Sequence, residues 1–319
     1  MTPTPTTAAR KDFLSVLDFD PPEIERCLDL AAQMKADRSL GIHAPASQVL
    51  NGRYVAMLFE KPSLRTRTTF EIAVRELGGQ PIILPSDVAL GRREPVIDVA
   101  RNLDRWVDFV VIRTFSQVVL TEFAAAAPRL HVINALTDEE HPCQALADFL
   151  TLRERLGPLR GRTLAFVGDG NNVVASLAHA SAMLGVNLHL ASPEGYQLRH
   201  AVVQQATAVA RHGARLRLFT DPVDAVASAD AVYTDVWTSM GQEAEAQVRR
   251  AVFMPYQVDD ALMAAAKPGA LFMHCLPAHR GEEVTAEVFE SDASVVFDQA
   301  ENRLHCQKAL LSMLLTPTA

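Results

Sequence analysis

The feature that most restricts the fold of this chain is a regular alternation of short apolar runs with segments of helical periodicity. Continuous apolar runs separated by helices are typical of parallel strands that crossover helices bury on both faces. An expected helix at 142–156, closed by Gly157 and Pro158, divides the runs into two sets. We therefore predict an α/β protein with two parallel sheets, formed by residues 54–59, 81–84, 108–112 and 130–133, and by residues 164–167, 188–191, 216–219, 231–234 and 270–273.

The length of the chain indicates two domains. With 319 residues it can bury two cores of ordinary size. We place the first domain at residues 1–145 and the second at residues 146–319, with interdomain helices joining them. An amphipathic pattern at about 300–315 predicts a C-terminal helix that packs back on the first domain.

The composition excludes several kinds of partner. Hydrophobic residues make up 49% of the chain and charged residues 21%, which is typical of a soluble globular protein. The net charge is −8, and the basic residues form no long run, so nucleic acid or an anionic membrane is not the expected partner. The sequence contains neither a long apolar span nor a signal peptide, which predicts a cytoplasmic protein. The four cysteines lack metal-type spacing and are expected to be thiols.

The most unusual stretch is residues 61–69, which lead from an expected strand into a helix. It carries three cationic side chains and four hydroxyls without an acid. The first turn of a helix normally favours acidic side chains, because the unpaired amides and the helix dipole attract negative charge. A basic first turn therefore favours a phosphate-binding site. The alternative is a solvated basic turn in which Ser63 is an ordinary N-cap, and this stretch alone gives the two equal weight.

Other polar clusters follow the expected strands directly, where the carboxyl ends of parallel strands form a ligand-binding edge. In the first set Arg113 follows one strand, and His141 and Gln144 come after the loop that follows another. These donors suit a small ligand with a phosphate and a carbonyl group. Each also has an ordinary interpretation, since Arg113 could pair with a neighbouring acid and His141 could help to cap the helix.

In the second set, three clusters remain open to more than one interpretation. The glycine-rich turn at 168–172 stands where a dinucleotide fingerprint would, but its third glycine is missing. Asp235 could bind a substrate ammonium group or could be an N-cap. Cys275 could be an inert buried thiol, or a cationic neighbourhood could lower its pKa.

Together these motifs resemble the aspartate/ornithine carbamoyltransferase family over nearly the whole chain, and its ornithine branch most closely. The resemblance is carried by residues 63–67, 141–144, 235–241, 274–277 and 300–303, which read SLRTR, HPCQ, DVWTSMG, HCLP and AENR. It implies a carbamoyl-phosphate domain followed by an ornithine domain, assembled as a homotrimer. The implied reaction transfers the carbamoyl group of carbamoyl phosphate to the δ-amine of ornithine, giving citrulline and phosphate for arginine biosynthesis, without a metal or an organic cofactor.

The resemblance also implies roles for individual residues, in two half-sites that face each other across a hinge. The expected catalytic residues are Cys275, acting as a thiolate near the δ-amine, Arg113 and His141. The expected carbamoyl-phosphate ligands are Ser63, Leu64, Arg65, Thr66, Arg113, His141, Gln144, Cys275, Leu276 and Arg303. The expected ornithine ligands are Asn172, Asp235, Ser239 and Met240.

The sequence departs from the family pattern at two positions. Leu64 stands where the family usually has Thr, and Ala89 where it usually offers Gln or His to the neighbouring subunit. Arg92 or Arg93 could replace that contact. Three rival functions therefore stay open: a carbamoyltransferase for putrescine or an acylated ornithine, a Rossmann-type dehydrogenase, and a paralogue without activity. The sequence does not fix the physiological direction of the reaction.

Overall fold

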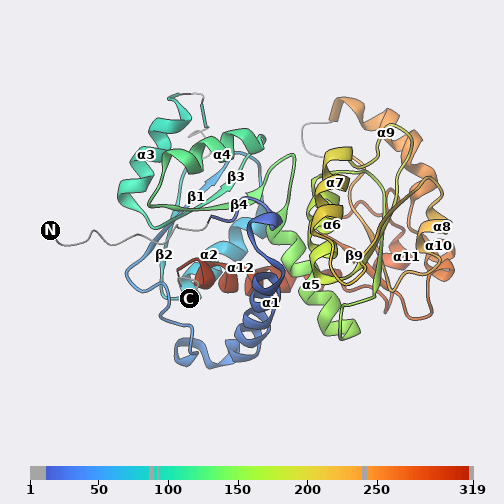
Figure 1. Ribbon diagram of the computed structural model, residues 1–319, viewed down its shortest axis with the longest axis horizontal. Helices are drawn as coiled ribbons and strands as arrows, with labels where there is room; N and C mark the ends of the chain where they lie inside the picture. Colours follow the sequence, from blue (N-terminus) through green and yellow to red (C-terminus); the bar gives the residue numbers. More distant parts are fainter. Residues whose placement is uncertain (1–11, 86–89, 92, 239–242, 316–319) are drawn as a thin grey trace. The chain divides into compact units, whose positions relative to one another are not determined.

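The structure, a computed structural model, describes residues 12–85, 90–91, 93–238 and 243–315. The chain forms two compact units, each with its own parallel sheet (Figure 1). The first unit consists of Met1–Phe19, Cys27–Asp138 and Leu304–Ala319, and the second of Asp20–Arg26 and Glu139–Arg303. The predicted α/β architecture with two parallel sheets is confirmed.

The first unit is built on a four-stranded parallel sheet with the strand order β2-β1-β3-β4. The strands are β1 (Tyr54–Phe59), β2 (Gln80–Ile83), β3 (Phe109–Arg113) and β4 (His131–Leu136). The helical segments in this part of the chain are η1 (Val16–Asp18), α1 (Pro21–Ala36), η2 (Asp37–His43), α2 (Leu64–Glu76), α3 (Val96–Trp106) and α4 (Gln117–Ala126).

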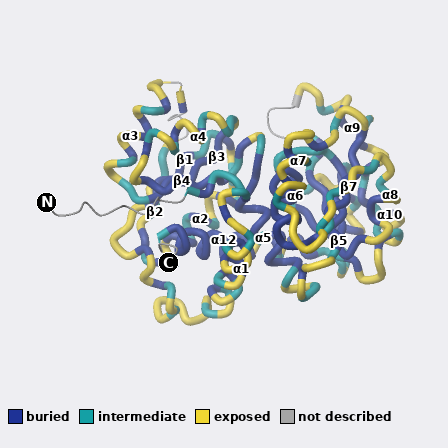
Figure 2. Tube along the Cα trace, viewed as in Figure 1, coloured by how far each residue is buried: buried dark blue, intermediate teal, exposed yellow. Residues whose placement is uncertain are grey.

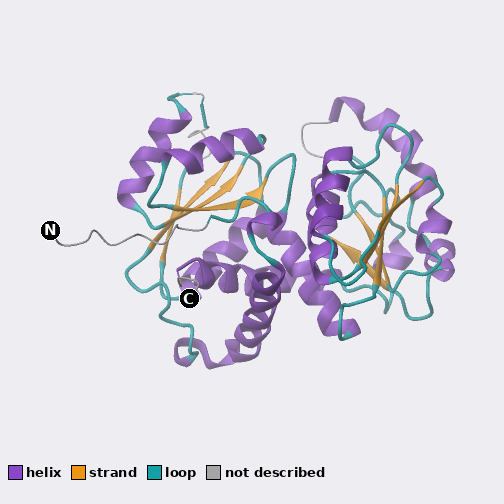
Figure 3. Ribbon diagram, in the orientation of Figure 1, coloured by secondary structure: helices purple, strands orange, loops and turns teal. Residues whose placement is uncertain are grey.

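Helices cover both faces of this sheet (Figure 3). On one face α3 and α4 bury Leu103 and Phe123 against Val110 and other strand residues. On the other face lies α2, whose Glu76 accepts a hydrogen bond from Lys308 at 2.9 Å. Lys308 belongs to α12 (Val296–Leu315), the C-terminal helix. The prediction that this helix packs back on the first domain is therefore confirmed.

The second unit is built on a five-stranded parallel sheet with the strand order β7-β6-β5-β8-β9. The strands are β5 (Thr163–Val167), β6 (Asn187–Ala191), β7 (Leu216–Phe219), β8 (Ala231–Thr234) and β9 (Leu271–His274). The helical segments are α5 (Pro142–Leu156), α6 (Asn172–Leu184), α7 (His200–Val209), α8 (Pro222–Val226), η3 (Glu243–Glu245), α9 (Ala246–Phe253), η4 (Met254–Tyr256), α10 (Asp260–Ala265), α11 (Ala286–Phe289) and the start of α12.

The second sheet is also enclosed by helices. Residues of α8, α9, α10 and α11 form one buried cluster with Val232 and Phe272 of the strands. Helices α5, α6 and α7 lie on the opposite face (Figure 1). The strand order changes direction between β5 and β8, and the polar loops that follow these strands lie at the carboxyl edge, where ligands bind in such sheets.

Burial explains why the strands could be found from sequence. The inner strands are mostly dark blue in Figure 2, because helices cover them on both sides. The edge strands β2 and β7 are partly exposed. All nine predicted runs form strands whose ends differ from the prediction by a few residues at most, and the helix predicted at 142–156 is α5.

Two other expectations concern the chemistry of the chain. All four cysteines are thiols rather than disulfides, as predicted, and Cys275 is the half-buried one. Among the residues that the structure describes, no helix has both the length and the hydropathy needed to cross a membrane.

Candidate active site

The basic turn after β1 forms the beginning of α2. Ser63 occupies the N-cap position with an extended backbone, but its side chain makes no capping hydrogen bond, and no acid lies in the first turn. Arg65 is half-buried, Thr66 is buried, and Leu64 is 76% exposed. Ser63 is therefore the N-cap residue by position, but it does not cap the helix with its side chain. The dipole at the start of α2 and the charge of Arg65 both favour an anion at this position.

An acid that the sequence analysis did not single out lies beside this turn. Glu60 follows β1 directly and accepts hydrogen bonds from the amide of Leu90, at 2.9 Å, and from the hydroxyl of Thr114. Thr114 follows Arg113, which ends β3 and is only 7% exposed. Since β1 and β3 are neighbours in the sheet, Glu60 fixes the segment that carries Arg113. A carboxylate immediately after a buried strand was the signal that could have identified it.

The start of α5 brings together three predicted residues of the second unit. His141 is the N-cap residue of α5, yet its side chain makes no capping hydrogen bond, so the capping interpretation of His141 is wrong. Its amide donates to Ser176 Oγ at 2.9 Å. One turn later the Oε1 atom of Gln144 accepts a hydrogen bond of 2.8 Å from Arg303, which is 2% exposed. Two predicted ligands 159 positions apart are thus in direct contact.

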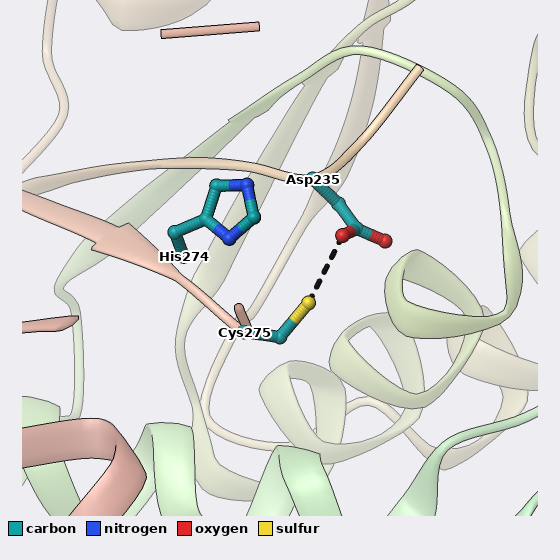
Figure 4. Close-up of side chains that lie close together, drawn as sticks. All are labelled: Asp235, His274 and Cys275. Carbon is teal, nitrogen blue, oxygen red and sulfur yellow. Dashed lines mark hydrogen bonds between the residues drawn. The ribbon is translucent and has the colours of Figure 1, made fainter. Parts of the chain in front are cut away.

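The predicted residues of the second sheet meet at the carboxyl ends of β8 and β9 (Figure 4). Cys275 Sγ donates a hydrogen bond to Asp235 Oδ1 over 3.0 Å. The other oxygen of Asp235 accepts the amide of Asn171 at 2.8 Å. No helix begins in the described residues that follow Asp235, through Thr238, so the N-cap interpretation of Asp235 is wrong. A buried carboxylate beside a thiol suits recognition of an amine.

The protonation state of Cys275 corrects the sequence analysis. Burial raises the pKa of the Cys275 thiol well above its usual value, and the charge of Asp235 and its hydrogen bond to the thiol raise that pKa further. Arg303 lowers the pKa of Cys275, but it is the smallest of these influences. The expected cationic neighbourhood is therefore outweighed by two acids and by desolvation. Without a ligand the group is a protonated thiol at neutral pH and not a thiolate.

The turn after β9 is held by His274. The ring Nε2 of His274 lies 3.2 Å from Glu283 Oε1, and its Nδ1 accepts the amide of Leu276 at 2.8 Å. Leu276 has a φ of 61°, which a branched residue rarely adopts, so this contact fixes a strained backbone. Asp235, His274 and Cys275 offer ligand atoms within 4.8 Å of one another, a donor set that zinc accepts. Both ring nitrogens of His274, however, are already engaged, one by Glu283 and the other by the amide of Leu276.

The glycine-rich turn after β5 does not provide the space of a dinucleotide site. The amide of Gly170 donates to Tyr196 at 2.8 Å, and a Cβ at Gly170 would lie only 2.3 Å from the amide nitrogen of Leu198. The glycine therefore permits close packing against the chain. Asn171 accepts the amides of Val173 and Val174, so it occupies the start of α6 where a pyrophosphate would bind. The dehydrogenase alternative has no structural support here.

Asn171 is also the main site residue that sequence reasoning missed. The predicted ligand was its neighbour Asn172, the first residue of α6. Asn171 uses its carbonyl oxygen as the helix cap and its amide nitrogen to hold Asp235. An Asn immediately before an apolar helical run is a recognised cap signal, and this signal could have identified the position. The second role depends on a residue 64 positions away.

Four residues named in the sequence analysis lie outside the described residues. They are two predicted ornithine ligands and two residues of the segment expected to reach a neighbouring subunit, namely Ser239, Met240, Ala89 and Arg92. Arg93 is described and is exposed.

Comparisons with known proteins match both halves of the chain. Residues 11–154 match the carbamoyl-P binding domain of aspartate/ornithine carbamoyltransferase, and residues 160–314 match its Asp/Orn binding domain. The ornithine carbamoyltransferase of Symbiobacterium thermophilum is 50% identical over 97% of this chain and 99% of its own. That of Thermosynechococcus vestitus is 52% identical over 97% of each chain. The solved structure of ornithine carbamoyltransferase from Pyrococcus furiosus superposes with a TM-score of 0.90, at 46% identity, covering 96% of this chain and 97% of the other.

Proposed function

The chain belongs to the aspartate/ornithine carbamoyltransferase family, and on this basis we propose that it transfers the carbamoyl group of carbamoyl phosphate to the δ-amine of ornithine, forming citrulline and phosphate. The observation that carries the proposal is the full-length match at about half identity to relatives that bear this activity in their names. We propose residues 1–145 as the carbamoyl-phosphate domain and residues 146–319 as the ornithine domain.

The test is phosphate release from carbamoyl phosphate with and without ornithine. We expect release that depends on ornithine and is matched mole for mole by citrulline. A panel with putrescine and N-acetylornithine separates the related transferases, because neither presents the α-ammonium and α-carboxylate groups together. Absence of ornithine-dependent release under conditions where the chain is folded would overturn the proposal, and faster reaction with either alternative amine would reassign the substrate.

We assign the binding of carbamoyl phosphate to individual residues. In the first unit Ser63, Leu64, Arg65 and Thr66 begin α2, where main-chain amides and a guanidinium suit the phosphate. We assign Arg113 and His141 to the carbonyl oxygen, since donors aimed at an oxygen that becomes negative stabilise the transition state more than the substrate. Gln144, Cys275, Leu276 and Arg303 complete the proposed ligand set.

The ornithine side must supply a neutral amine. A lysine-like amine has a pKa of about 10.4, so deprotonation at neutral pH costs about 4 to 5 kcal/mol. Exclusion of water from the site supplies part of this, because desolvation disfavours the ammonium form. We assign Asp235 to the α-ammonium group, with Asn172, Ser239 and Met240 as further ornithine ligands. Cys275 is assigned to the δ-amine.

The protonated state of Cys275 suggests that the substrate itself activates this thiol. A thiol cannot remove a proton from an ammonium group, but a cation brought next to Cys275 lowers its pKa by favouring the charged form. We therefore expect ornithine alone to increase the ultraviolet absorbance of the thiolate in the wild-type protein. The Cys275→Ala variant should show no such increase. An unchanged thiolate signal in the wild type at saturating ornithine would argue against substrate-induced ionisation.

The contact between Asn171 and Asp235 leads to a more specific prediction. In Asn171→Ser the hydroxyl can still cap α6, but the amide that holds Asp235 is lost. We expect the KM for ornithine to rise about tenfold, the effect of one lost hydrogen bond to a charged group. The melting temperature and the affinity for carbamoyl phosphate should stay unchanged. A lower melting temperature with an unaltered KM would mean that Asn171 serves only as a cap.

Three further assignments rest on the resemblance. We propose that the chain assembles as a homotrimer, that it acts in the cytoplasm and that it serves arginine biosynthesis. Light scattering on the purified protein tests the first of these, since a monomeric mass under assay conditions would contradict it.

A further inference from the structure

A buried carboxylate on α5 links several parts of the proposed site without being one of its predicted ligands. Asp148 lies one turn after Gln144 and is fully buried. Its Oδ1 atom accepts hydrogen bonds from Gln144 Nε2 at 2.8 Å and from Gln299 Nε2 at 2.9 Å. Its Oδ2 atom accepts a hydrogen bond from the hydroxyl of Tyr233 at 3.2 Å. Three donors from α5, α12 and β8 thus converge on one side chain.

These contacts determine which way two amide side chains point. An ionised carboxylate has no hydrogen to donate, so both glutamines must turn their NH₂ groups toward Asp148. Their oxygens then face away from it. The oxygen of Gln144 accepts Arg303 Nη1 at 2.8 Å, and the oxygen of Gln299 accepts the main-chain amide of His274 at 2.9 Å. His274 directly precedes Cys275. Asp148 therefore orients Arg303 through Gln144, and it orients the end of β9 that carries the thiol through Gln299.

We propose that Asp148 is a positioning residue whose ionised carboxylate holds Arg303 and the His274–Cys275 end of β9 in the arrangement required for carbamoyl transfer. This inference rests on the proposed function, but Asp148 itself is not among the proposed ligands of either substrate. A neutral side chain does not meet the same requirement. An Asn at this position could direct its NH₂ group at Tyr233, which would leave the buried hydroxyl hydrogen of Tyr233 without an acceptor. It could instead direct its NH₂ group at the two glutamines, whose NH₂ groups would then face another donor.

The cost of this carboxylate to stability supports a functional reason for it. Burial raises the pKa of Asp148 to about 6, although Gln144, Gln299, Tyr233 and Arg303 each lower it in part. The folded chain therefore holds this proton more tightly than the unfolded chain, whose pKa is 3.8. Ionisation of Asp148 consequently reduces the free energy of unfolding, fully above the folded pKa and not at all below the unfolded pKa. The fold retains a charge that destabilises it.

The surroundings of Asp148 also predict a pH dependence. The charged and titratable groups that interact with Asp148, directly or through a neighbour, are Arg303 on α12, Tyr233 on β8, Cys275 after β9 and Asp235 after β8. Protonation of Asp148 places a hydrogen among three donors, so turnover should fall as the pH drops through the pKa of about 6. Tyr233→Phe removes one of the donors that lower this pKa. In Tyr233→Phe the acid limb of the pH profile, which is the fall of kcat at low pH, should therefore move to higher pH.

The experiment compares Asp148→Asn with wild type and with a control on the same sheet. We expect Asp148→Asn to lower kcat about 10- to 100-fold at neutral pH, the scale of a small misplacement at an active site, and to flatten the acid limb. The control is Asp230→Asn. Asp230 precedes β8 and binds Arg162 at 3.1 Å and Lys267 at 2.9 Å, and these contacts lower its pKa, so it stabilises the fold. Asp230→Asn should lower the melting temperature and leave kcat unchanged.

A second readout does not require the proposed reaction. The charge of Asp148 raises the pKa of Cys275, so Asp148→Asn should accelerate alkylation of Cys275 by iodoacetamide, measured by mass spectrometry, while Asp230→Asn should not. A wild type without ornithine-dependent phosphate release would overturn the proposed function but leave this readout intact. The role of Asp148 would be overturned if Asp148→Asn kept the wild-type kcat, the wild-type fall of turnover at acid pH and the wild-type alkylation rate. It would also be overturned if the fall of turnover at acid pH stayed at the wild-type pH in Tyr233→Phe.

Discussion

Replacement of Cys275 by alanine is expected to lower kcat about 10³-fold, within the range that a positioned acid or base contributes. The thiol is held against Asp235 at 3.0 Å, at the end of β9, and we assign it to the reacting δ-amine. Removal of the sulfur leaves the amine without its contact when it must lose a proton. Stopped-flow or steady-state assays of citrulline formation measure the effect.

The affinity for carbamoyl phosphate serves as the internal control for this variant. Since the proposed phosphate ligands begin α2, calorimetric titration of Cys275→Ala with carbamoyl phosphate should give a Kd close to that of the wild type. A Cys275→Ser variant, which restores a hydrogen-bonding group of lower acidity, should recover part of the lost rate. Turnover equal to that of the wild type in Cys275→Ala would remove this residue from the mechanism.

Replacement of Arg65 by alanine is expected to weaken carbamoyl-phosphate binding about 10²- to 10³-fold, the effect of truncating one partner of a desolvated charge pair. Arg65 stands in the first turn of α2, where no acidic side chain offsets its charge within that turn. Its loss leaves the helix dipole and main-chain amides as the anion site, and these provide less energy than a guanidinium fork. Isothermal titration with carbamoyl phosphate measures the change.

The same helix offers a matched control. Arg67 lies two residues further along α2 and is exposed, so it points to a different side of the helix. Arg67→Ala removes the same charge and should change the Kd by less than about threefold, the scale of a screened surface charge. Normal affinity in Arg65→Ala would refute the proposed phosphate role. Equal losses in the two variants would indicate that general positive charge, rather than a specific contact, binds the ligand.

The sequence alone was sufficient for most of the architecture because buried parallel strands leave a simple pattern. The runs at 54–59 and 231–234 coincide with β1 and β8 because helices cover both faces and strongly favour apolar side chains. The helix 142–156 was equally clear, since Pro142 begins it and Gly157 follows its end. The ends of other strands, such as β4, shifted because a strand continues wherever a neighbour offers hydrogen bonds.

Side-chain partners were the part that sequence reasoning could not supply. Asp148 was missed because its role depends on residues that only the folded chain brings near. Glu60 had a signal in its place after a strand, but its partners Leu90 and Thr114 are known only from the fold. The protonation state of Cys275 was predicted wrongly for a related reason. Sequence order indicated basic residues elsewhere in the site, but the nearest charge in the fold is the acid Asp235. Distance and desolvation, which decide a pKa, are properties of the packed structure.

Strand β8 has an acid at each of its ends. Asp230, at the amino end, is tied to two cations and to the amide of Thr163, while Asp235, at the carboxyl end, faces the thiol. We therefore expect substitutions around Asp230 to change stability without disturbing the chemistry, and substitutions at the carboxyl end of the strand to impair it. A survey of substitutions that persist under thermal selection should accordingly find them concentrated at the amino rim of this sheet.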